Sequence, residues 1–304
     1  MNESCDNLVI LGLGLMGGSL ARAVRASGFC GRIIGCGHRE HSLRRGLELG
    51  IVDEFTLDLD EAAARADIFV VCTPTLAAAE VLERLLPDWP ADGPVLTDVA
   101  SVKGSLRDTA VRVAGAVPPR LVLAHPIAGS ERSGVEASTA ELFVGHRVIM
   151  TPVPGNDPRA LELVRQMWQS AGAEVVEMSV DAHDAILAAT SHLPHMLAYT
   201  LVDALAASGD SDEMFRCAAG GFRDFTRIAA SDPVMWRDIA LANRDALLEA
   251  IDVFSDHLGR LRAAVAAGDG DTLHSSFTRA KRARDEFAQL LTARGDRPIV
   301  KSDG

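Results

Sequence analysis

Short apolar runs alternate with longer segments of helical spacing through the first half of the chain. Runs of this kind are typical of buried strands, and the segments between them carry apolar residues three and four positions apart. The predicted strands are residues 7–11, 32–36, 68–72, 95–97, 121–124, 147–150 and 174–178. The predicted helices are residues 17–26, 42–50, 76–86, 104–114 and 159–171. This alternation predicts an α/β fold with a doubly wound, mostly parallel sheet.

The pattern changes after residue 178. From there on the chain is rich in alanine and leucine, apolar residues recur with a period near 3.6, and no further strand is indicated. The predicted helices are residues 180–207, 233–258, 261–267 and 270–293. The sequence therefore predicts an α/β domain over residues 1–178 and an all-α domain over residues 179–304. Because helices this long and apolar usually pack on more than one partner, we expect the second domain to form a homodimer.

Composition narrows the class of protein. The chain has 304 residues, 48% of them hydrophobic, which is enough for one large or two ordinary domains. Its net charge of −12 argues against nucleic-acid and anionic-membrane partners, so an anionic substrate must be bound by local cations or helix termini. We find no apolar run long enough to span a bilayer and no basic leader. The five cysteines form no CxxC pair, and we expect reduced thiols in a cytoplasmic protein.

The first predicted strand leads into a glycine-rich turn, GLGLMGG, which opens a helix. In a strand–GxGxxG–helix unit the first glycine permits the tight turn, the second lets the backbone approach a pyrophosphate, and the third allows close packing of helix on strand. The phosphates then lie at the helix N-terminus. The sequence predicts a Rossmann dinucleotide site, with the cofactor-binding residues Gly12, Gly14, Leu15, Met16 and Gly17.

The end of the second strand lacks the usual acidic residue. About 20 residues after the glycines, where a carboxylate would bind the ribose of NAD, the sequence reads Cys36-Gly37-His38-Arg39. Gly37 leaves room for a 2′-phosphate, and His38 and Arg39 are suited to neutralise it, which favours tolerance of NADP beside NAD. In the alternative, Arg39 stacks on adenine or faces solvent, and Glu40 or a backbone group holds the ribose.

Later strand ends bring further residues to the same edge of the sheet. Thr73 and Pro74 are expected to form a wall for the ribose of the cofactor. Ser101 is expected near the nicotinamide; its alternative role is the N-cap of the helix that begins near Lys103. His125 closes the apolar run of the fifth strand, where open α/β sheets bind ligands, and is a candidate base. The alternative for His125 is a strand cap that hydrogen-bonds the following turn.

Polar residues interrupt the helical half at TSHLPH. Ser191 and His195 share a helix face there, and His192 lies three residues from His195. Pro194 is expected to kink the helix, which often marks a cavity. Two histidines at this spacing are compatible with a metal, but no carboxylate or cysteine completes such a site in the sequence. We therefore favour an anion pocket and predict no metal.

A second polar segment, GGFRDFTRIAASDPVMW, covers residues 220–236. Its glycines, alternating charges and proline indicate a structured loop rather than a packing helix. Arg223 and Arg227 are two cations within this short segment, so they are candidates for binding an anion.

In this order, the segments GLGLMGG, DVASVK, HPIAGSE, TSHLPH and GFRDFTRIAASDPVMW resemble the motifs of the prephenate and arogenate dehydrogenases of tyrosine biosynthesis. The resemblance runs from Leu8 to about Phe287, and the last four motifs are far more specific than the first. It implies oxidative decarboxylation of prephenate to 4-hydroxyphenylpyruvate, or of arogenate to tyrosine, with NAD or NADP taking the hydride.

The resemblance also implies roles for individual residues. His125 acts on the C4 hydroxyl of the substrate as base or polariser, and Ser101 orients both groups. Arg227 binds the ring carboxylate, for which a guanidinium fork suits better than lysine, and Asp224 pairs with an arginine at the subunit boundary. The other substrate-binding positions are Ser130, Glu131, Ser191, His192, His195, Gly220, Arg223 and Trp236. The alternatives are a core role for Trp236 and a solvated turn role for Glu131.

Prephenate and arogenate differ by one amino group. A cation at Arg223 favours the pyruvyl side chain over an ammonium, so we expect prephenate as the substrate, with arogenate or both as the alternative. A β-hydroxyacid dehydrogenase is disfavoured because such enzymes use a lysine on the interdomain helix, and residues 180–207 contain none. A non-catalytic NADP sensor would not need His125, Ser101 and Arg227 together.

Overall fold

The computed structural model describes residues 5–129, 132–209 and 211–293; at residues 211, 212 and 290–293 it describes the backbone. The chain forms two compact units, Met1–Leu247 and Leu248–Gly304. The expected domain boundary after residue 178 stays a prediction.

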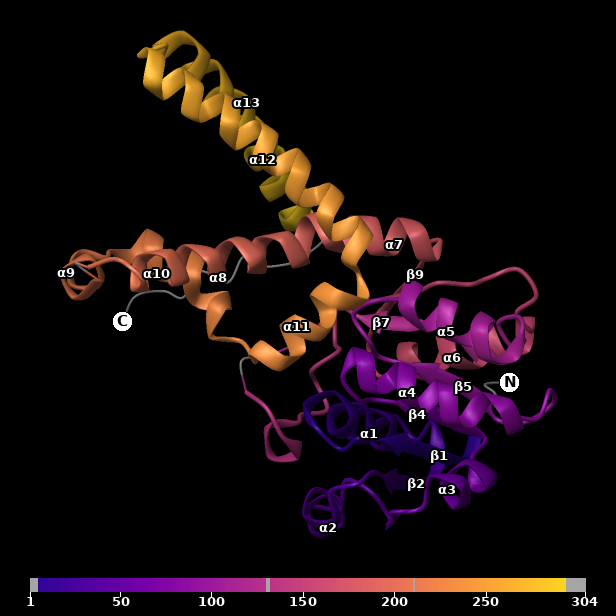
Figure 1. Ribbon diagram of the computed structural model, residues 1–304. Coiled ribbons are helices and arrows are strands. Elements are labelled where there is room, and N and C mark those ends of the chain that lie inside the picture. The colour runs from indigo at the N-terminus through magenta and orange to yellow at the C-terminus, as the bar shows by residue number, and fades with distance from the viewer. Residues whose placement is uncertain (1–4, 130–131, 210, 294–304) are drawn as a thin grey trace. The chain divides into compact units, whose positions relative to one another are not determined.

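The first unit is built on a six-stranded parallel sheet in the order β3-β2-β1-β4-β5-β6 (Figure 1). Its strands are β1 (Cys5–Leu11), β2 (Cys30–Cys36), β3 (Glu54–Thr56), β4 (Ile68–Val71), β5 (Val95–Asp98) and β6 (Leu121–Val122). The α-helices that accompany them are α1 (Leu15–Ser27), α2 (Glu40–Glu48), α3 (Leu59–Arg65), α4 (Thr75–Leu85), α5 (Gly104–Ala114) and α6 (Pro158–Ser170). In this order β1 lies between β2 and β4, as in dinucleotide-binding folds, and the predicted fold class is confirmed.

Both faces of the sheet are buried. In β1, Leu8 and Ile10 belong to one core cluster, whereas Val9 and Leu11 belong to the other. Alternate side chains of a strand point to opposite faces, so apolar residues at consecutive positions require cover on both sides. Because full burial of one such side chain contributes about 1.5–3 kcal/mol, these positions set the register of the sheet.

Two short elements of the first unit, β3 and α3, were not predicted from the apolar pattern of the sequence. Strand β3 has three residues and α3 has seven. The helix begins because the side chain of Asp58 accepts hydrogen bonds from the backbone N–H groups of Asp60 and Glu61. Elements this short span too few periods for an apolar pattern to be recognised.

The apolar run at residues 121–124 is divided between two sheets. The second sheet contains β7 (Ala124–Pro126), β8 (Arg147–Met150) and β9 (Glu174–Glu177). Strand β7 is antiparallel to β8, and β8 is parallel to β9. His125 therefore lies inside a strand, opposite Ile149, and not after the end of one as predicted. Because both sheets bury apolar side chains, the run itself does not reveal where the chain passes from one to the other.

The predicted helix at residues 180–207 is interrupted. Helix α7 (Val180–Leu187) passes into a π-helical turn, η3 (Ala188–His192), and then into α8 (Leu193–Ala206). Pro194 has no N–H to donate to Thr190, so the chain widens ahead of it. A kink was expected at Pro194, and the helix is irregular there through this π-helical turn.

Residues 220–236 are mostly helical, which corrects the predicted loop. The segment contains α10 (Gly220–Thr226), the 3₁₀ turn η4 (Arg227–Ala230) and the start of α11 (Pro233–Ala242), and α9 (Ser211–Cys217) precedes it. Gly220 and Gly221 lie in the first turn of α10, where the backbone N–H groups have no helical partners in any case. Asp232 caps α11 by accepting from the backbone of Val234 and Met235.

The last two helices are α12 (Arg244–Ala267), which begins in the first unit, and α13 (Gly270–Ala293). They are joined at Gly268, whose φ of 66° favours glycine. The helix predicted at residues 233–258 breaks at Asn243, whereas α12 continues without a break into residues 261–267. Across the described ranges, no helix is both long and apolar enough to cross a membrane. The five cysteines are free thiols.

Candidate active site

The turn between β1 and α1 has the geometry of a nucleotide cradle. Gly12 has a φ of 98°, and a Cβ on it would lie 2.8 Å from the carbonyl oxygen of Cys72. A Cβ on Gly17 would lie 2.2 Å from the carbonyl oxygen of Gly12, so the helix packs on the turn only because this residue has no side chain. A Cβ on Gly14 would meet nothing within 4 Å. The turn is therefore closed on the protein side and open at Gly14, as a bound pyrophosphate requires.

The start of α1 is open to an anion. The helix begins with Leu15 and Met16, without a side-chain cap and without an acidic residue in its first turn, so its positive end is available. Next to it, the hydroxyl of Thr73 is buried and has no hydrogen-bond partner among the described residues. Pro74 follows as the N-cap residue of α4. These residues fit a dinucleotide, which would supply the missing partner of Thr73.

His38 and Arg39 lie at the end of β2, at the same edge of the sheet. Both are exposed, and Arg39 Nε donates to His38 Nε2 at 3.2 Å. Glu40, the alternative ligand for the ribose, forms an ion pair with Arg44 one helical turn further on. The two basic side chains therefore lie at the same edge of the sheet as the β1–α1 turn.

His125 is buried in β7 and contacts a second histidine. Its Nδ1 lies 2.9 Å from Nε2 of His183 in α7, and His183 Nδ1 lies 2.7 Å from Oδ1 of Asp184. Burial lowers the pKa of His125 well below its ordinary 6.5, and the nearby His183, Lys103 and His192 lower it further. His125 is therefore neutral near pH 7, as a proton acceptor must be.

Asp184 caps helix α5 from a distant part of the chain. Its carboxylate oxygens accept from the backbone N–H groups of Lys103 at 2.9 Å and Gly104 at 2.7 Å. A Cβ on Gly104 would lie 2.6 Å from Asp184 Oδ2, so only glycine lets the carboxylate approach. Ser101, the expected alternative cap, is half-buried three residues before the first residue of the helix and provides no cap hydrogen bond. The start of α5 is thereby joined to α7.

A buried ion pair holds the strand that carries His125. Lys103 is fully buried, pairs with Asp98 at the end of β5, and donates to the carbonyl oxygen of Ala124 at 2.8 Å. Asp98 also accepts from the backbone N–H of Ala124 at 3.2 Å. Removing one partner of a buried pair typically costs about 3–5 kcal/mol, so this contact ties β5, α5 and β7 together.

His192 lies behind this network. The amide of Asn243 donates to the carbonyl oxygen of Asp184 at 2.9 Å, and its nitrogen lies 3.0 Å from Nδ1 of His192. The amide nitrogen only donates, so Nδ1 of His192 accepts and the ring is neutral. Burial lowers the pKa of His192 to about 4. The π-helical turn that ends at His192 thus rests on α11 through Asn243.

His195 and Trp236 form a stacked pair. Their ring centroids are 3.5 Å apart, and His195 Nδ1 lies 2.8 Å from the carbonyl oxygen of Ser191. Burial lowers the pKa of His195, the bond to Ser191 opposes this, and the charge of Arg227 adds to it, so Arg227 lies within electrostatic reach of the ring. Trp236 also packs on Val102 in a small core cluster, which is the core role given as its alternative; its role in the substrate pocket stays a prediction.

Other predicted substrate residues are less constrained. Gly220 begins α10, and Arg223 in the same helix is exposed and donates from Nε to Asp224 at 3.2 Å. Asp224 thus has a partner within its own chain, and its predicted pairing across a subunit boundary stays a prediction. Ser130 and Glu131 lie outside the described residues.

Four residues of this network were not predicted as site residues from the sequence: Lys103, His183, Asp184 and Asn243. Three of them carried a signal, because His183 and Asp184 form a titratable pair in the first turns of a predicted helix and Lys103 ends the DVASVK motif. Asn243 carried none, since a polar residue in a helix is usually solvated. Contacts between residues so far apart in the chain are set by tertiary packing.

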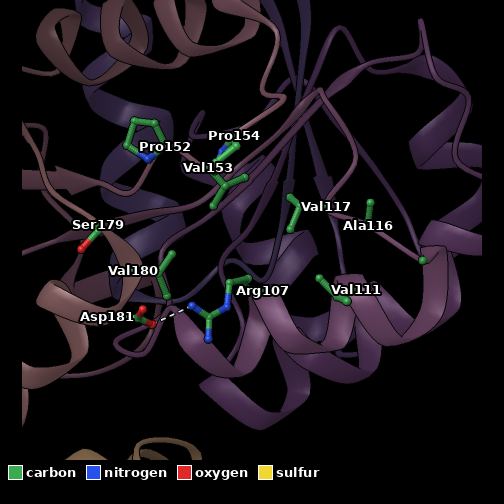
Figure 2. A pocket seen from close by; sticks show the side chains of 11 residues that line it. Arg107, Val111, Ala116, Val117, Pro152, Val153, Pro154, Ser179, Val180 and Asp181 are labelled. Carbon is green, nitrogen blue, oxygen red and sulfur yellow. Dashed lines mark hydrogen bonds and ion pairs between the residues drawn. The ribbon is translucent and has the colours of Figure 1, made fainter.

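A surface pocket of about 470 Å³ lies between α5 and the start of α7 (Figure 2). Its lining includes Arg107, whose Nη1 donates to Asp181 at 2.6 Å, and the apolar side chains of Val111 and Val180. None of the predicted site residues lines it. We assign the site to the histidine cluster instead, because perturbed titratable groups gather there.

Comparisons with known proteins agree with the predicted fold class. Residues 20–177 match the family description "Prephenate dehydrogenase, nucleotide-binding domain", and residues 179–279 match "Prephenate dehydrogenase, dimerization domain". The chain belongs to the prephenate dehydrogenase family. The family membership expected from the sequence is therefore confirmed.

Relatives of this prephenate dehydrogenase family member resemble it over most of its length. It is 36% identical to the cyclohexadienyl dehydrogenase of Zymomonas mobilis, over 91% of this chain and 94% of that protein. It is 35% identical to the prephenate dehydrogenase of Bacillus subtilis, over 94% of this chain and 77% of that protein. The crystal structure of A. aeolicus prephenate dehydrogenase in complex with hydroxyphenyl propionate and NAD+ is 37% identical, with a TM-score of 0.87, over 94% of this chain and 100% of that chain.

Proposed function

We propose that the chain catalyses the NAD-dependent oxidative decarboxylation of prephenate to 4-hydroxyphenylpyruvate in tyrosine biosynthesis. The observation that carries the proposal is the buried, neutral His125, held beside the carboxyl edge of a dinucleotide-binding sheet. The names of the relatives support the substrate class. The acidic charge and the free thiols favour a cytoplasmic enzyme.

Gly12, Gly14 and Gly17, the start of α1, and Thr73 with Pro74 would hold the cofactor. When bound, its nicotinamide ring supplies the acceptor for the hydride that leaves C4 of the substrate. NAD is bound by the structure related at a TM-score of 0.87. His38 and Arg39 support the further proposal that NADP is tolerated, because two basic side chains stand where a 2′-phosphate would lie.

His125 acts on the C4 hydroxyl. The hydroxyl proton moves to Nε2 of His125 as hydride leaves C4, and the bond to the ring carboxylate breaks, with its electron pair entering the ring as CO2 departs. The product ring is aromatic, which drives this step. The proton then returns from His125 to the phenolate oxygen, so the histidine ends the cycle neutral.

The remaining roles concern binding. Arg227 is proposed to hold the ring carboxylate with its guanidinium fork, and Ser101 to orient the C4 hydroxyl. The substrate side chain would lie near the stacked rings of His195 and Trp236, with Ser191 and His192 behind them. Arg223 supports prephenate over arogenate, since a cation near the side chain disfavours an ammonium. Use of arogenate, or of both substrates, is the alternative.

We also propose a homodimer formed through the helical part of the chain. Large apolar side chains are exposed at many helical positions from α7 to α13, which is unusual for a monomer. They are Ile186, Leu201, Met214, Phe215, Phe225, Val234, Met235, Leu241, Leu248, Val253, Leu258, Val265, Phe277 and Phe287. Sedimentation at micromolar concentration should give twice the chain mass of 32.3 kDa, and a stable monomer would contradict the proposal.

The function is tested by following absorbance at 340 nm with NAD or NADP and with prephenate or arogenate, in a two-by-two comparison. We expect the highest kcat/KM with NAD and prephenate, and measurable turnover with NADP. A higher kcat/KM with arogenate would reverse the substrate assignment. Cofactor binding without turnover in all four combinations would contradict the dehydrogenase and favour a sensor.

A further inference from the structure

The hydrogen bonds of His125 determine which of its two nitrogens carries the proton. Within the part of the chain that the structure describes, the hydrogen bonding of the His125 ring is through Nδ1, 2.9 Å from His183 Nε2. The direction of this bond depends on the proton of His183. A neutral imidazole donates from one nitrogen and accepts at the other, so one assigned proton determines the rest of the chain of bonds.

Asp184 determines which nitrogen of His183 carries the proton. Its Oδ1 lies 2.7 Å from His183 Nδ1, and a carboxylate only accepts hydrogen bonds. Burial alone would raise the pKa of Asp184, but the bonds from His183 and from the backbone of Lys103 and Gly104 outweigh burial and lower it, so the group is ionised. His183 therefore carries its proton on Nδ1 and accepts at Nε2. His125 must then donate from Nδ1, which leaves the lone pair on its Nε2.

The position of Asp184 is itself strongly constrained. Its two oxygens accept from two successive backbone N–H groups at the start of α5, where the helix dipole also favours a negative charge. A few residues earlier in α7, Asp181 accepts from Arg107 of α5 at 2.6 Å (Figure 2). Helix α7 is thus held on α5 at two points. The two backbone N–H groups fix the orientation of the Asp184 carboxylate beside His183.

We propose that His183 and Asp184 are positioning residues that hold His125 in the Nδ1–H tautomer and stabilise its imidazolium during turnover. The proposal rests on the proposed function, because it assigns Nε2 of His125 as the atom that receives the C4 hydroxyl proton. On protonation, His125 keeps its Nδ1–H bond to His183, and the His183 bond to the Asp184 carboxylate strengthens. When the proton returns to the phenolate oxygen, the tautomers of both rings are unchanged.

Other charged and titratable groups face the two rings. Lys103 from the start of α5 and His192 from the π-helical turn act on His125, and Asp98 from the end of β5 acts with Lys103 on His183. Lys103 disfavours a second positive charge, whereas Asp98 and Asp184 favour one. Because Lys103 is already paired with Asp98, the carboxylate of Asp184 is the charge that the imidazolium of His125 senses through His183.

The tautomers are measured directly in the protein without substrate. Nitrogen-15 NMR of the histidine rings distinguishes Nδ1–H from Nε2–H, and we expect both His125 and His183 to be protonated on Nδ1 near neutral pH. An Nε2–H tautomer for His125 would overturn the proposal. This readout needs no activity, so it stands apart from any failure of the proposed function.

Two substitutions of His183 separate its hydrogen bond from its volume. His183→Phe keeps an aromatic ring but removes the acceptor, and we expect kcat to fall about tenfold or more as His125 populates both tautomers. His183→Gln presents a carbonyl oxygen to His125 and an amide to Asp184, and should recover part of the loss. Equal kcat in His183→Phe and the wild type would overturn the proposal.

The charge of Asp184 is tested against a matched aspartate in the same helix. Asp184→Asn should lower kcat about tenfold or more and move the acid limb of the kcat/KM profile down by about half a pH unit, because the imidazolium of His125 loses a stabilising charge. Asp181→Asn also weakens the contact with α5 but should leave kcat and the limb in place. If Asp184→Asn lowered kcat without moving the acid limb of the kcat/KM profile, the carboxylate would have only a structural role. The same would follow if Asp181→Asn changed kcat and the limb as much as Asp184→Asn does.

Discussion

The turn between β1 and α1 owes its shape to backbone atoms, those of the turn itself and the carbonyl oxygen of Cys72. The surroundings of His125 are made by side chains from β5, α5, α7 and α11. In the turn, a Cβ on Gly17 would meet the carbonyl oxygen of Gly12 only five positions earlier. In the network, His183 lies 58 positions from His125, and Asp184 lies 81 positions from Lys103. The first region forms once β1 and β4 lie side by side in the sheet, while the second exists only once α7 has docked on α5.

This difference separates binding from chemistry. The cradle presents a helix terminus and an open glycine, which recognise a phosphate but carry no titratable group. The network contains histidines whose pKa is lowered, so that they are neutral and able to accept a proton. Substitutions in the cradle should therefore change cofactor affinity, whereas substitutions in the network should change kcat and the pH profile.

The largest effect is expected from His125→Asn. The variant removes the proton acceptor from the network and leaves the cradle intact, so kcat with prephenate should fall by about 10²-fold or more. The affinity for NAD, measured by titration of protein fluorescence, should stay the same. His146→Asn, at an exposed histidine, is the control and should keep full activity. If His125→Asn lost NAD affinity in step with kcat, the separation between the two regions would not hold.

The next effect is a loss of stability in mild acid that arises in the network. The pKa of His192 is lowered to about 4 in the folded chain, below the ordinary value near 6.5 of an unfolded chain. Its neutral form therefore stabilises the fold fully above pH 6.5, and this contribution is lost as the pH falls towards 4, up to about 3 kcal/mol.

Urea unfolding at pH 7 and pH 4.5 measures this loss. The variant His192→Gln keeps an acceptor for Asn243 but does not titrate, so its free energy of unfolding should fall less between the two pH values. The other buried histidines titrate in both proteins and cancel from the difference. An equal decline in the wild type and the variant would show that His192 is not the group that takes up the proton.

The two regions also differ in how far the sequence predicts them. The cradle was predicted residue by residue, because Gly12, Gly14 and Gly17 have meaning at a fixed spacing after a strand. His125 was singled out through its place after an apolar run and through family resemblance, although the run turned out to end in another sheet. The roles proposed for these residues stay predictions.

The partners of His125 were not predictable in the same way. Asp184 acts on α5 and on His183 at once, but the sequence shows only that it follows a histidine. Asp181 of the same helix pairs with the half-buried Arg107 instead. A pattern read along one helix gives the face on which a residue lies but not the element that packs there. The prediction of a loop at residues 220–236 was wrong for a related reason, since glycines in the first turn of a helix do not end that helix.

Within the cradle, two glycines should behave oppositely. Gly17→Ala places a Cβ against a backbone oxygen and should lower the free energy of unfolding by about 1–3 kcal/mol. It should also lower the affinity for NAD. Gly14→Ala meets open space, so it should cost less than about 1 kcal/mol in stability but still weaken NAD by blocking the close approach of the pyrophosphate. Thermal unfolding with and without NAD separates the two. Equal stability of both variants would contradict the packing assigned to Gly17.

The smallest effect concerns the edge of the cradle that sets the choice of cofactor. Arg39 is exposed beside His38 and has no role in the network, so Arg39→Ala should leave kcat with NAD unchanged. If its guanidinium meets a 2′-phosphate, kcat/KM with NADP should fall about tenfold, which is the contribution of one charge-assisted hydrogen bond. Arg44→Ala, which removes an exposed arginine in the first turns of α2, is the control and should leave kcat/KM with both cofactors unchanged. An equal fall with NAD and NADP would instead favour stacking of Arg39 on adenine, because that part is common to both cofactors.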